Sequence, residues 1–270
     1  MSPYCVKFPR LKYVAGIKMI LLLDIGNTRI KWGGLIGGEF QSGGVLPRGE
    51  GDIQNVMAAV QAKQYRPSRV VVSNVAQASY CERLQIEVGV NWGCPVELVE
   101  TQAAALGVVN GYDEPHQLGV DRWLALIAAR QMYKGALCVV DCGTALTVDL
   151  LTDEGVHLGG MIAPGVSLMQ GALLNNAAGL HVASEWRIGD DATFMARNTA
   201  DAILNGARYS SIALIDRLYF DAQRELGTEV LLVLTGGDAV MLQPHLRHGG
   251  VLESELVLKG VAMIAGAADQ

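Results

Sequence analysis

The sequence predicts an α/β protein built from two similar halves, each with a mixed sheet flanked by helices. The main support is a repeat: an apolar strand, an Asp-x-Gly loop and a second strand occur near residue 19 and again near residue 136. No low-complexity segment separates the two copies. With 50% hydrophobic and 18% charged residues, the 270-residue chain can bury a substantial core. We therefore expect halves at 19–135 and 136–270, with a cleft between them.

The first half is expected to alternate strands and helices. Residues 52–63 carry apolar side chains at helical spacing, and the valine run 70–72 is typical of a buried strand. The pair Gly37-Gly38 predicts a hairpin turn. The expected strands are 20–23, 29–36, 39–45, 70–72 and 96–99, and the expected helices are 52–63, 77–88 and 121–133.

The second half repeats this order. Its first strand, 136–140, runs into an Asp-x-Gly loop, and Pro164-Gly165 opens a helix. A long helical stretch covers 198–226. The other expected strands are 147–151, 158–163 and 230–234, and the other expected helices are 164–174 and 256–267.

Composition and the N-terminal segment exclude several classes of protein. Residues 1–18 hold basic side chains but no long apolar run, so we expect a poorly ordered extension and not a signal peptide. No apolar stretch approaches the ~20 residues that span a bilayer, so no membrane partner is expected. The net charge of −6 without a basic stripe argues against nucleic acid. Five irregularly spaced cysteines predict free thiols and a cytoplasmic location.

The first loop, Asp24 to Lys31, has the chemistry of a phosphate site. Gly26 lets the backbone approach a ligand, and the loop amides can donate to phosphate oxygens. Lys31 adds a positive charge, while Asp24 could hold Mg²⁺ through water. An ordinary β-turn would explain this segment equally well.

Two further turns follow strands. Asp141-Cys142-Gly143-Thr144 repeats the logic of the first loop, and Thr235-Gly236-Gly237-Asp238 could let a flat base pack on backbone. Each alone is explained by a plain turn. Two Asp-x-Gly loops in matching positions are less easily accidental. Neither a Gly-x4-Gly-Lys-Ser/Thr loop nor a Gly-x-Gly-x-x-Gly turn after a strand occurs in the sequence.

These loops, in this order, resemble the actin, heat-shock chaperone and sugar kinase superfamily. Gly119-Val120-Asp121-Arg122, the segment from Gly159 to Gly165, and Asn198-Thr199 narrow the resemblance to type III pantothenate kinase. The resemblance covers residues 19 to about 265. It implies two actin-like (ribonuclease H-like) halves with a nucleotide cleft between them, and transfer of the ATP γ-phosphate to pantothenate in coenzyme A synthesis.

The resemblance also implies roles for individual residues. Asp121 would be the catalytic base, Asp141 the site of a monovalent cation (K⁺ or NH₄⁺), and Asp24 a contact to Mg²⁺ through water. A homodimer formed by the long helices of the second half is implied as well. The implied ATP-binding residues are Asp24, Ile25, Gly26, Asn27, Thr28, Arg29, Ile30, Lys31 and Thr144, and the implied substrate-binding residues are Tyr112, Gly119, Val120, Asp121, Arg122 and Thr199.

The side chains of Asp121 and Arg122 are chemically suited to the roles that the resemblance implies for them. A carboxylate placed to accept the proton of a primary hydroxyl makes that hydroxyl a better nucleophile, and Arg122 could bind a substrate carboxylate in a fork. Without the resemblance, Asp121-Arg122 would be ordinary charges at a helix start. The alternatives are a kinase for another small hydroxyl compound, a phosphatase that cleaves phosphate chains, and a non-catalytic regulatory protein of the same fold.

Overall fold

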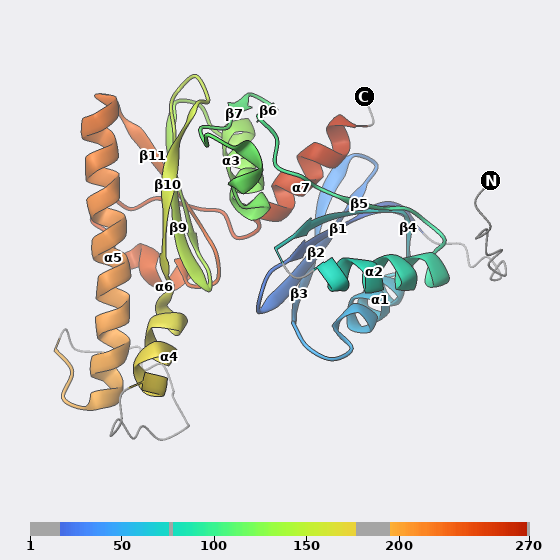
Figure 1. Ribbon diagram of the computed structural model, residues 1–270, viewed down its shortest axis with the longest axis horizontal. Helices are drawn as coiled ribbons and strands as arrows, with labels where there is room; N and C mark the ends of the chain where they lie inside the picture. Colours follow the sequence, from blue (N-terminus) through green and yellow to red (C-terminus); the bar gives the residue numbers. More distant parts are fainter. Residues whose placement is uncertain (1–16, 76–77, 177–194, 269–270) are drawn as a thin grey trace. The chain divides into compact units, whose positions relative to one another are not determined.

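The computed structural model describes residues 17–75, 78–176 and 195–268. Residues 1–16 of the expected extension therefore lie outside the described residues. The described chain forms two compact units (Figure 1). The first comprises residues up to Glu100 and from Val261 onward, and the second is Thr101–Gly260. Each unit contains one of the two predicted sheets, whereas the predicted boundaries of the halves and the cleft between them stay predictions.

The first unit is a five-stranded mixed sheet with strand order β3-β2-β1-β4-β5. Two helices, α1 (Asp52–Ala62) and α2 (Ala78–Asn91), bury their apolar stripes on one face of it. Val60 and Val88 are fully buried there against alternate residues of β1. The strands are β1 (Ile17–Ile25), β2 (Arg29–Ile36), β3 (Glu39–Pro47), β4 (Tyr65–Asn74) and β5 (Val96–Leu98).

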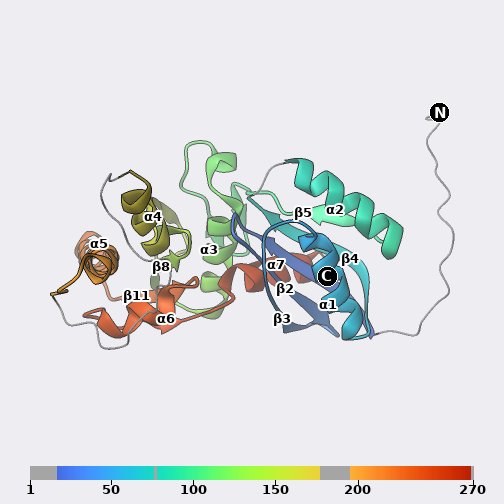
Figure 2. The same cartoon turned by 90° about the horizontal axis from the view of Figure 1, so that it is seen from below.

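The second unit holds another five-stranded sheet, with order β10-β9-β8-β11-β12. Helix α3 (Val120–Met132) and helix α5 (Thr199–Leu226) lie on opposite sides of this sheet in Figure 1. Helix α4 (Val166–Asn176) runs beside α5 in both views (Figures 1 and 2). The strands are β8 (Ala136–Cys142), β9 (Ala145–Leu151), β10 (His157–Pro164), β11 (Val230–Thr235) and β12 (Val251–Leu252).

The two sheets have the same topology, which confirms the predicted repeat. In each, the first strand pairs antiparallel with the second and parallel with the fourth. The two loop aspartates occupy matching positions. Asp24 of β1 pairs with Lys31 and Ser73, and Asp141 of β8 pairs with Thr147 and Thr235.

The predicted strands and long helices of the described part are all present, with ends shifted by a few residues. The elements that sequence missed are very short, since two residues or one helical turn carry no readable periodicity. None of the helices in the described ranges is long and apolar enough to cross a membrane. The remaining elements are β6 (Ala104–Ala105), β7 (Val108–Val109), η1 (Pro115–Gln117), α6 (Ala239–Leu242), η2 (Gln243–His245) and α7 (Leu256–Ala267).

Candidate functional site

The first Asp-x-Gly loop is a tight turn between β1 and β2. Its ends are fixed by burial, because Ile25 and Ile30 are at most 1% exposed, and by the bond from the Gly26 amide to the Arg29 carbonyl, 3.0 Å. Asp24 is 8% exposed, whereas Asn27 is exposed at the tip. The turn therefore presents backbone and short polar groups to solvent next to a buried carboxylate, as a phosphate site requires.

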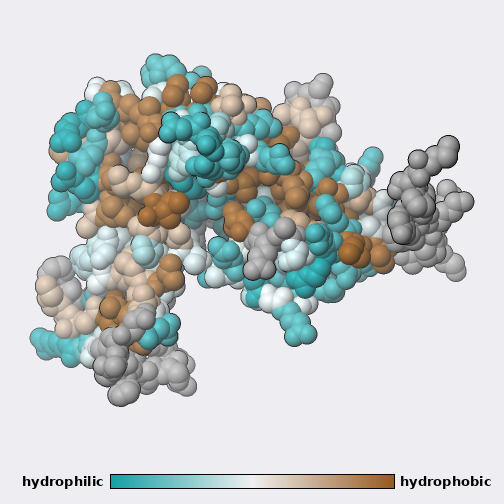
Figure 3. All heavy atoms as spheres, viewed as in Figure 1, coloured by the Kyte–Doolittle hydropathy of each residue, from teal (hydrophilic) through white to brown (hydrophobic). Residues whose placement is uncertain are grey.

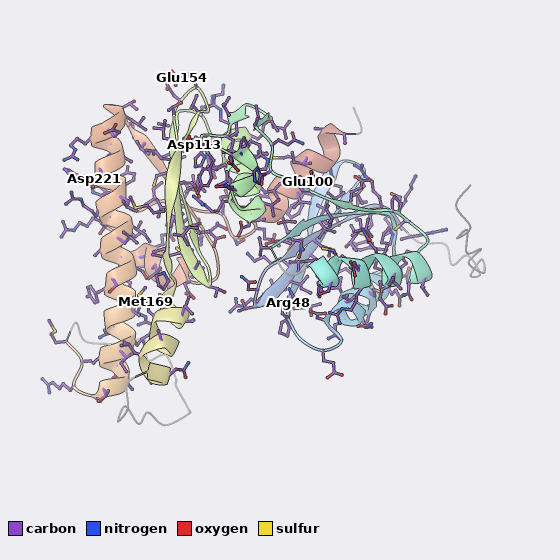
Figure 4. The ribbon with its side chains drawn as sticks, in the orientation of Figure 1. Arg48, Glu100, Asp113, Glu154, Met169 and Asp221 are labelled. Atoms are coloured by element: carbon purple, nitrogen blue, oxygen red, sulfur yellow. The ribbon has the colours of Figure 1, made fainter. Side chains whose placement is uncertain are left out.

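Arg48 braces this loop, and the sequence patterns did not predict a role for this residue. Its Nη1 donates to the Gly26 carbonyl at 2.9 Å, and its backbone amide donates to the Thr28 carbonyl at 2.9 Å. The guanidinium is held from behind by Asp52, with Nε to Oδ2 at 3.0 Å, and lies 4.2 Å from the centre of the Tyr80 ring. Burial, followed by the Asp52 charge, raises the pKa of Tyr80. Figure 4 labels Arg48 at the end of β3.

The second loop packs on two glycine turns of the same unit. A Cβ on Gly236 would lie 2.4 Å from Asp141 Oδ1, so only glycine permits this approach. The Gly165 amide donates to the Thr144 carbonyl at 3.0 Å, and the Asp238 amide donates to the Cys142 carbonyl at 2.9 Å. The structure thus brings the Asp141 loop and the Gly236 turn together.

Asp121 lies in the first turn of α3, after the N-cap residue Gly119. Its Oδ1 accepts a hydrogen bond from the Arg122 amide at 2.8 Å, which fixes the carboxylate at the helix start. A Cβ on Gly119 would meet this oxygen at 2.6 Å, so the glycine is needed for close passage of the backbone. Asp121 remains partly exposed, as a proton acceptor for a bound ligand must be.

The neighbouring Arg122 points inward and is 6% exposed. Its Nε and Nη2 donate to Asp149 at 2.8 and 2.5 Å, and its Nη1 donates to the Tyr112 hydroxyl at 2.7 Å. Burial alone would lower the pKa of Arg122, but the hydrogen bonds and charge of Asp149 outweigh it and raise the pKa. Asp149 therefore occupies the Nε and Nη2 edge of the guanidinium, and the predicted fork from Arg122 to a substrate carboxylate stays a prediction.

Asp149 and His157, neighbours on β9 and β10, complete this cluster. His157 Nε2 lies 2.9 Å from Asp149 Oδ1, and the His157 ring stacks on Tyr112 with centroids 5.9 Å apart and an interplanar angle of 14°. The loop that carries Tyr112, marked by Asp113 in Figure 4, lies beside the β9–β10 hairpin. Sequence analysis missed both residues, although a charge inside the apolar strand 145–151 was a usable signal.

Thr199 belongs to a different element from the members of this cluster. It is the first residue of α5, after the N-cap Asn198, whose side chain accepts from the Asp201 amide at 2.8 Å. Thr199 lines a groove between α4 and α5 whose other described lining residues are mostly apolar. Tyr112, Gly119, Val120, Asp121 and Arg122 do not belong to that lining.

The residues with predicted roles are divided between the two units. Residues 24–31 belong to the first unit, whereas Thr144 and the residues predicted to bind substrate belong to the second. Across residues 17–75, 78–176 and 195–268, no three His, Cys, Asp or Glu side chains gather as metal ligands. Asp24 and Asp141 could each offer a single carboxylate to a cation.

Several curated proteins similar to this chain are type III pantothenate kinases. The enzyme of Nitrosococcus oceani is 39% identical over 252 residues, which cover 92% of this chain and 94% of that protein. The enzyme of Aromatoleum aromaticum is 39% identical over 249 residues, with 92% and 98% covered.

Solved structures support the predicted fold. A "conserved putative Baf family transcriptional activator" from Campylobacter jejuni matches with a TM-score of 0.56 at 22% identity, covering 93% of this chain and 99% of that one. A "putative N-acetylmannosamine kinase" from Listeria monocytogenes matches with a TM-score of 0.50 at 13% identity, with 93% and 100% covered. At such identities the likeness concerns the fold alone, and it confirms the actin-like, sugar kinase type of α/β fold.

The sequence profile described as type III pantothenate kinase matches residues 20–221, which hold both Asp-x-Gly loops and the segment Gly119-Val120-Asp121-Arg122. Together with relatives that are 39% identical over 92% of its length, this match shows that the chain belongs to the type III pantothenate kinase family.

Proposed function

We propose that this protein transfers the γ-phosphate of ATP to the primary hydroxyl of pantothenate, the first step of coenzyme A synthesis. The observation that carries the proposal is Asp121, a carboxylate fixed at the start of α3 beside the buried cation Arg122. Membership of the family supports the same reaction.

Asp121 is proposed as the general base. One of its oxygens is oriented by the Arg122 amide, and the other can accept the proton of the substrate hydroxyl. As that proton leaves, the hydroxyl oxygen bonds to the γ-phosphorus and the bond to the β-phosphate oxygen breaks, which releases ADP. The carboxylate needs only to be placed and charged for this role, because phosphoryl transfer depends mostly on positioning.

The loop Asp24 to Lys31 is proposed to hold the ATP phosphates, with Thr144 as a further nucleotide contact. Backbone amides and Lys31 would counter the charge on the phosphate oxygens. The Arg48 brace supports this role, since it occupies the Gly26 carbonyl with a hydrogen bond and fixes the turn in advance.

Two cations fit the residues present. Mg²⁺ typically takes one or two carboxylates plus phosphate oxygens and water, which agrees with the single buried Asp24 and with the lack of a three-ligand cluster among the described residues. A monovalent cation (K⁺ or NH₄⁺) is proposed at Asp141, whose Oδ1 lies close to the Gly236 turn. When bound, the cations would neutralise phosphate charge; Asp24 and Asp141 would supply oxygen ligands.

A cytoplasmic homodimer is proposed as the working form. Cys81, Cys94, Cys138 and Cys142 are free thiols, as in reducing compartments. The second unit exposes large apolar side chains along β10 and α5, such as Ile162 at 65% and Phe220 at 55%. In Figure 3, hydrophobic residues lie over the sheet of this unit, whereas the outer side of the α5 region is mostly hydrophilic. Such patches usually mark interfaces.

The dimer is tested by sedimentation. Ile162→Glu and Phe220→Glu should halve the mass, while Ile86→Glu, which changes an equally exposed side chain on α2, should not. An unchanged mass in both interface variants would move the interface elsewhere.

The reaction is tested with a substrate panel. Purified full-length protein is given ATP, Mg²⁺ and K⁺ with pantothenate, an N-acylated hexosamine or a polyphosphate, and ADP release is followed. Acceptor-dependent ADP release with pantothenate only is expected, and it should fall when Na⁺ replaces K⁺. Turnover with a different acceptor, or a folded protein with no turnover at all, would overturn the proposal in favour of another kinase or of a regulatory protein.

A further inference from the structure

A buried polar network joins four segments of the second unit at the acceptor site. The Asp149 carboxylate is 2% exposed and faces three donors: Arg122 Nε and Nη2, and His157 Nε2. His157 is 1% exposed, and Tyr112 is half-buried above it. A buried carboxylate keeps its charge at low cost only when such donors are present.

The direction of each hydrogen bond determines what the network offers to a ligand. Arg122 has only donors, so in its contact with Tyr112 the phenol oxygen accepts from Nη1 at 2.7 Å. The phenol hydrogen of Tyr112 must then point away from Arg122. Tyr112 is the member of the network that reaches solvent. An O–H whose oxygen already accepts from a cation is polarised and becomes a stronger donor.

The charges lead to the same conclusion. Asp149 sits in the side-on fork of Arg122 with both partners at most 5% exposed, so the guanidinium charge is largely countered inside the protein. An incoming anion therefore does not find a free arginine fork. The donors left for it are the Tyr112 hydroxyl and the remaining Nη1 and Nη2 hydrogens of Arg122.

The side chain of His157 contributes one hydrogen bond to the network, the one to Asp149. Its Nδ1 is buried and has no hydrogen-bond partner among the described residues, so the bond to Asp149 is its one polar contact there. The carbonyl of His157 packs so closely on the Tyr112 loop that a Cβ on Gly111 would overlap it, at 1.7 Å. His157 thus contacts both ends of the network. Its Nε2 holds the Asp149 carboxylate that binds Arg122, and its ring supports the ring of Tyr112.

We propose that Asp149 and His157 are positioning residues that make the acceptor site selective for a carboxylate, by fixing Arg122 so that the Tyr112 hydroxyl donates to the substrate's carboxylate group. This inference rests on the proposed function. The glycine at position 160 supports this inference, because a Cβ there would come within 2.4 Å of Arg122 Nη2 and 2.3 Å of Asp149 Oδ1. Only glycine at that position leaves the network its space.

The experiment compares two ligands that differ at one group: pantothenate, and pantothenyl alcohol, in which CH₂OH replaces the carboxylate. Dissociation constants are measured by calorimetry, so turnover of the alcohol is not needed. The variants are the isosteric Asp149→Asn; His157→Phe, which keeps the stacked ring and removes Nε2; Tyr112→Phe; and the double variant Asp149→Asn/Tyr112→Phe. Glu253→Gln, which alters a partly buried carboxylate with two donors elsewhere in the same unit, is the control.

Each single network variant should weaken pantothenate binding about 10-fold or more, the scale of a hydrogen bond to a charged group, and alcohol binding less than about 3-fold. The KM for pantothenate should rise with a smaller change in kcat. The double variant should be no worse than its worse parent, since the residues act through one hydroxyl. Glu253→Gln should leave the ratio of the two dissociation constants unchanged.

Equal losses for both ligands, or additive losses in the double variant, would overturn the inference and assign the network a structural role only. Those outcomes leave the proposed function intact, provided the wild-type protein still forms product. A folded wild-type protein that neither binds pantothenate nor forms product would instead overturn the proposed function, and the inference with it.

Discussion

The Asp149 carboxylate accepts two hydrogen bonds from the Arg122 guanidinium, from Nε at 2.8 Å and from Nη2 at 2.5 Å, with both side chains almost fully buried. The pair links β9 to α3 at the residue that follows Asp121. The same contact therefore affects the stability of the second unit as well as the position of the helix start that carries Asp121.

Removing one member of this pair should destabilise the protein strongly. Arg122→Met leaves the Asp149 charge buried with only His157 as a donor, and a loss of about 3–5 kcal/mol in the free energy of unfolding is expected. Arg122→Met/Asp149→Leu should recover most of that loss, because no unpaired charge remains. Urea denaturation measures both; a double variant no more stable than Arg122→Met alone would contradict the account.

Asp121→Asn should separate binding from chemistry. The amide keeps the size of the side chain and an oxygen for the Arg122 N–H, but it cannot take a proton. The expected result is unchanged ATP binding with kcat lower by at least ~10²-fold, the usual scale for loss of a general base. Rapid-quench kinetics and a nucleotide titration check this. Turnover close to wild type would remove Asp121 from the base role.

Arg48→Lys should weaken ATP use selectively. Lysine keeps the charge but cannot bond Gly26 and Asp52 at once in the fixed fork of arginine, so the loop Asp24 to Lys31 loses its brace. The KM for ATP should rise about 10-fold, the size of one charged hydrogen bond, with the KM for pantothenate little changed. Arg69→Lys, which alters an ion pair with Glu97 elsewhere in the same unit, is the matched control. Equal effects of the two variants would contradict a special role for Arg48.

The order of the elements could be predicted from sequence because it depends on local patterns. Apolar runs, Gly-Gly turns and the two Asp-x-Gly loops each involve neighbouring residues, and together they revealed the repeat. The parallel pairing of β11 with β8 could not be predicted in the same way, since it joins residues about a hundred positions apart through packing. Strand β12 has two residues and no pattern to detect.

The candidate site divides along the same line. Asp121 and the loop at Asp24 are encoded in short continuous segments. Asp149 and His157 were missed, since Asp149 lies 27 positions from its partner Arg122 and 8 from His157. The sequence shows that a charge inside an apolar strand needs a partner, but it does not show which residue the partner is.

Glu253 provides a pH-dependent stability prediction. Burial would raise the pKa of this carboxyl, but the hydrogen bonds from Lys259 and Tyr133 outweigh it, so the pKa is lowered. The charged Glu253 carboxylate therefore contributes to the free energy of unfolding above its unfolded-state pKa of about 4.3. This contribution is lost as pH falls through the lower folded-state pKa. Glu253→Gln should therefore cost about 1–2 kcal/mol at pH 7, with the difference from wild type shrinking below about pH 4. Urea denaturation at both pH values is the check; a constant difference would show that the charge of Glu253 is not involved.

The identity of the product tests the central claim most directly. Full-length protein is incubated with ATP, Mg²⁺, K⁺ and pantothenate, and the mixture is examined by ³¹P NMR with proton coupling. The account predicts ADP and one new phosphomonoester in equal amounts, with the phosphorus coupled to the two protons of the primary carbinol carbon of pantothenate. Coupling to the secondary carbinol proton, release of inorganic phosphate alone, or no change in ATP with a folded protein would contradict it.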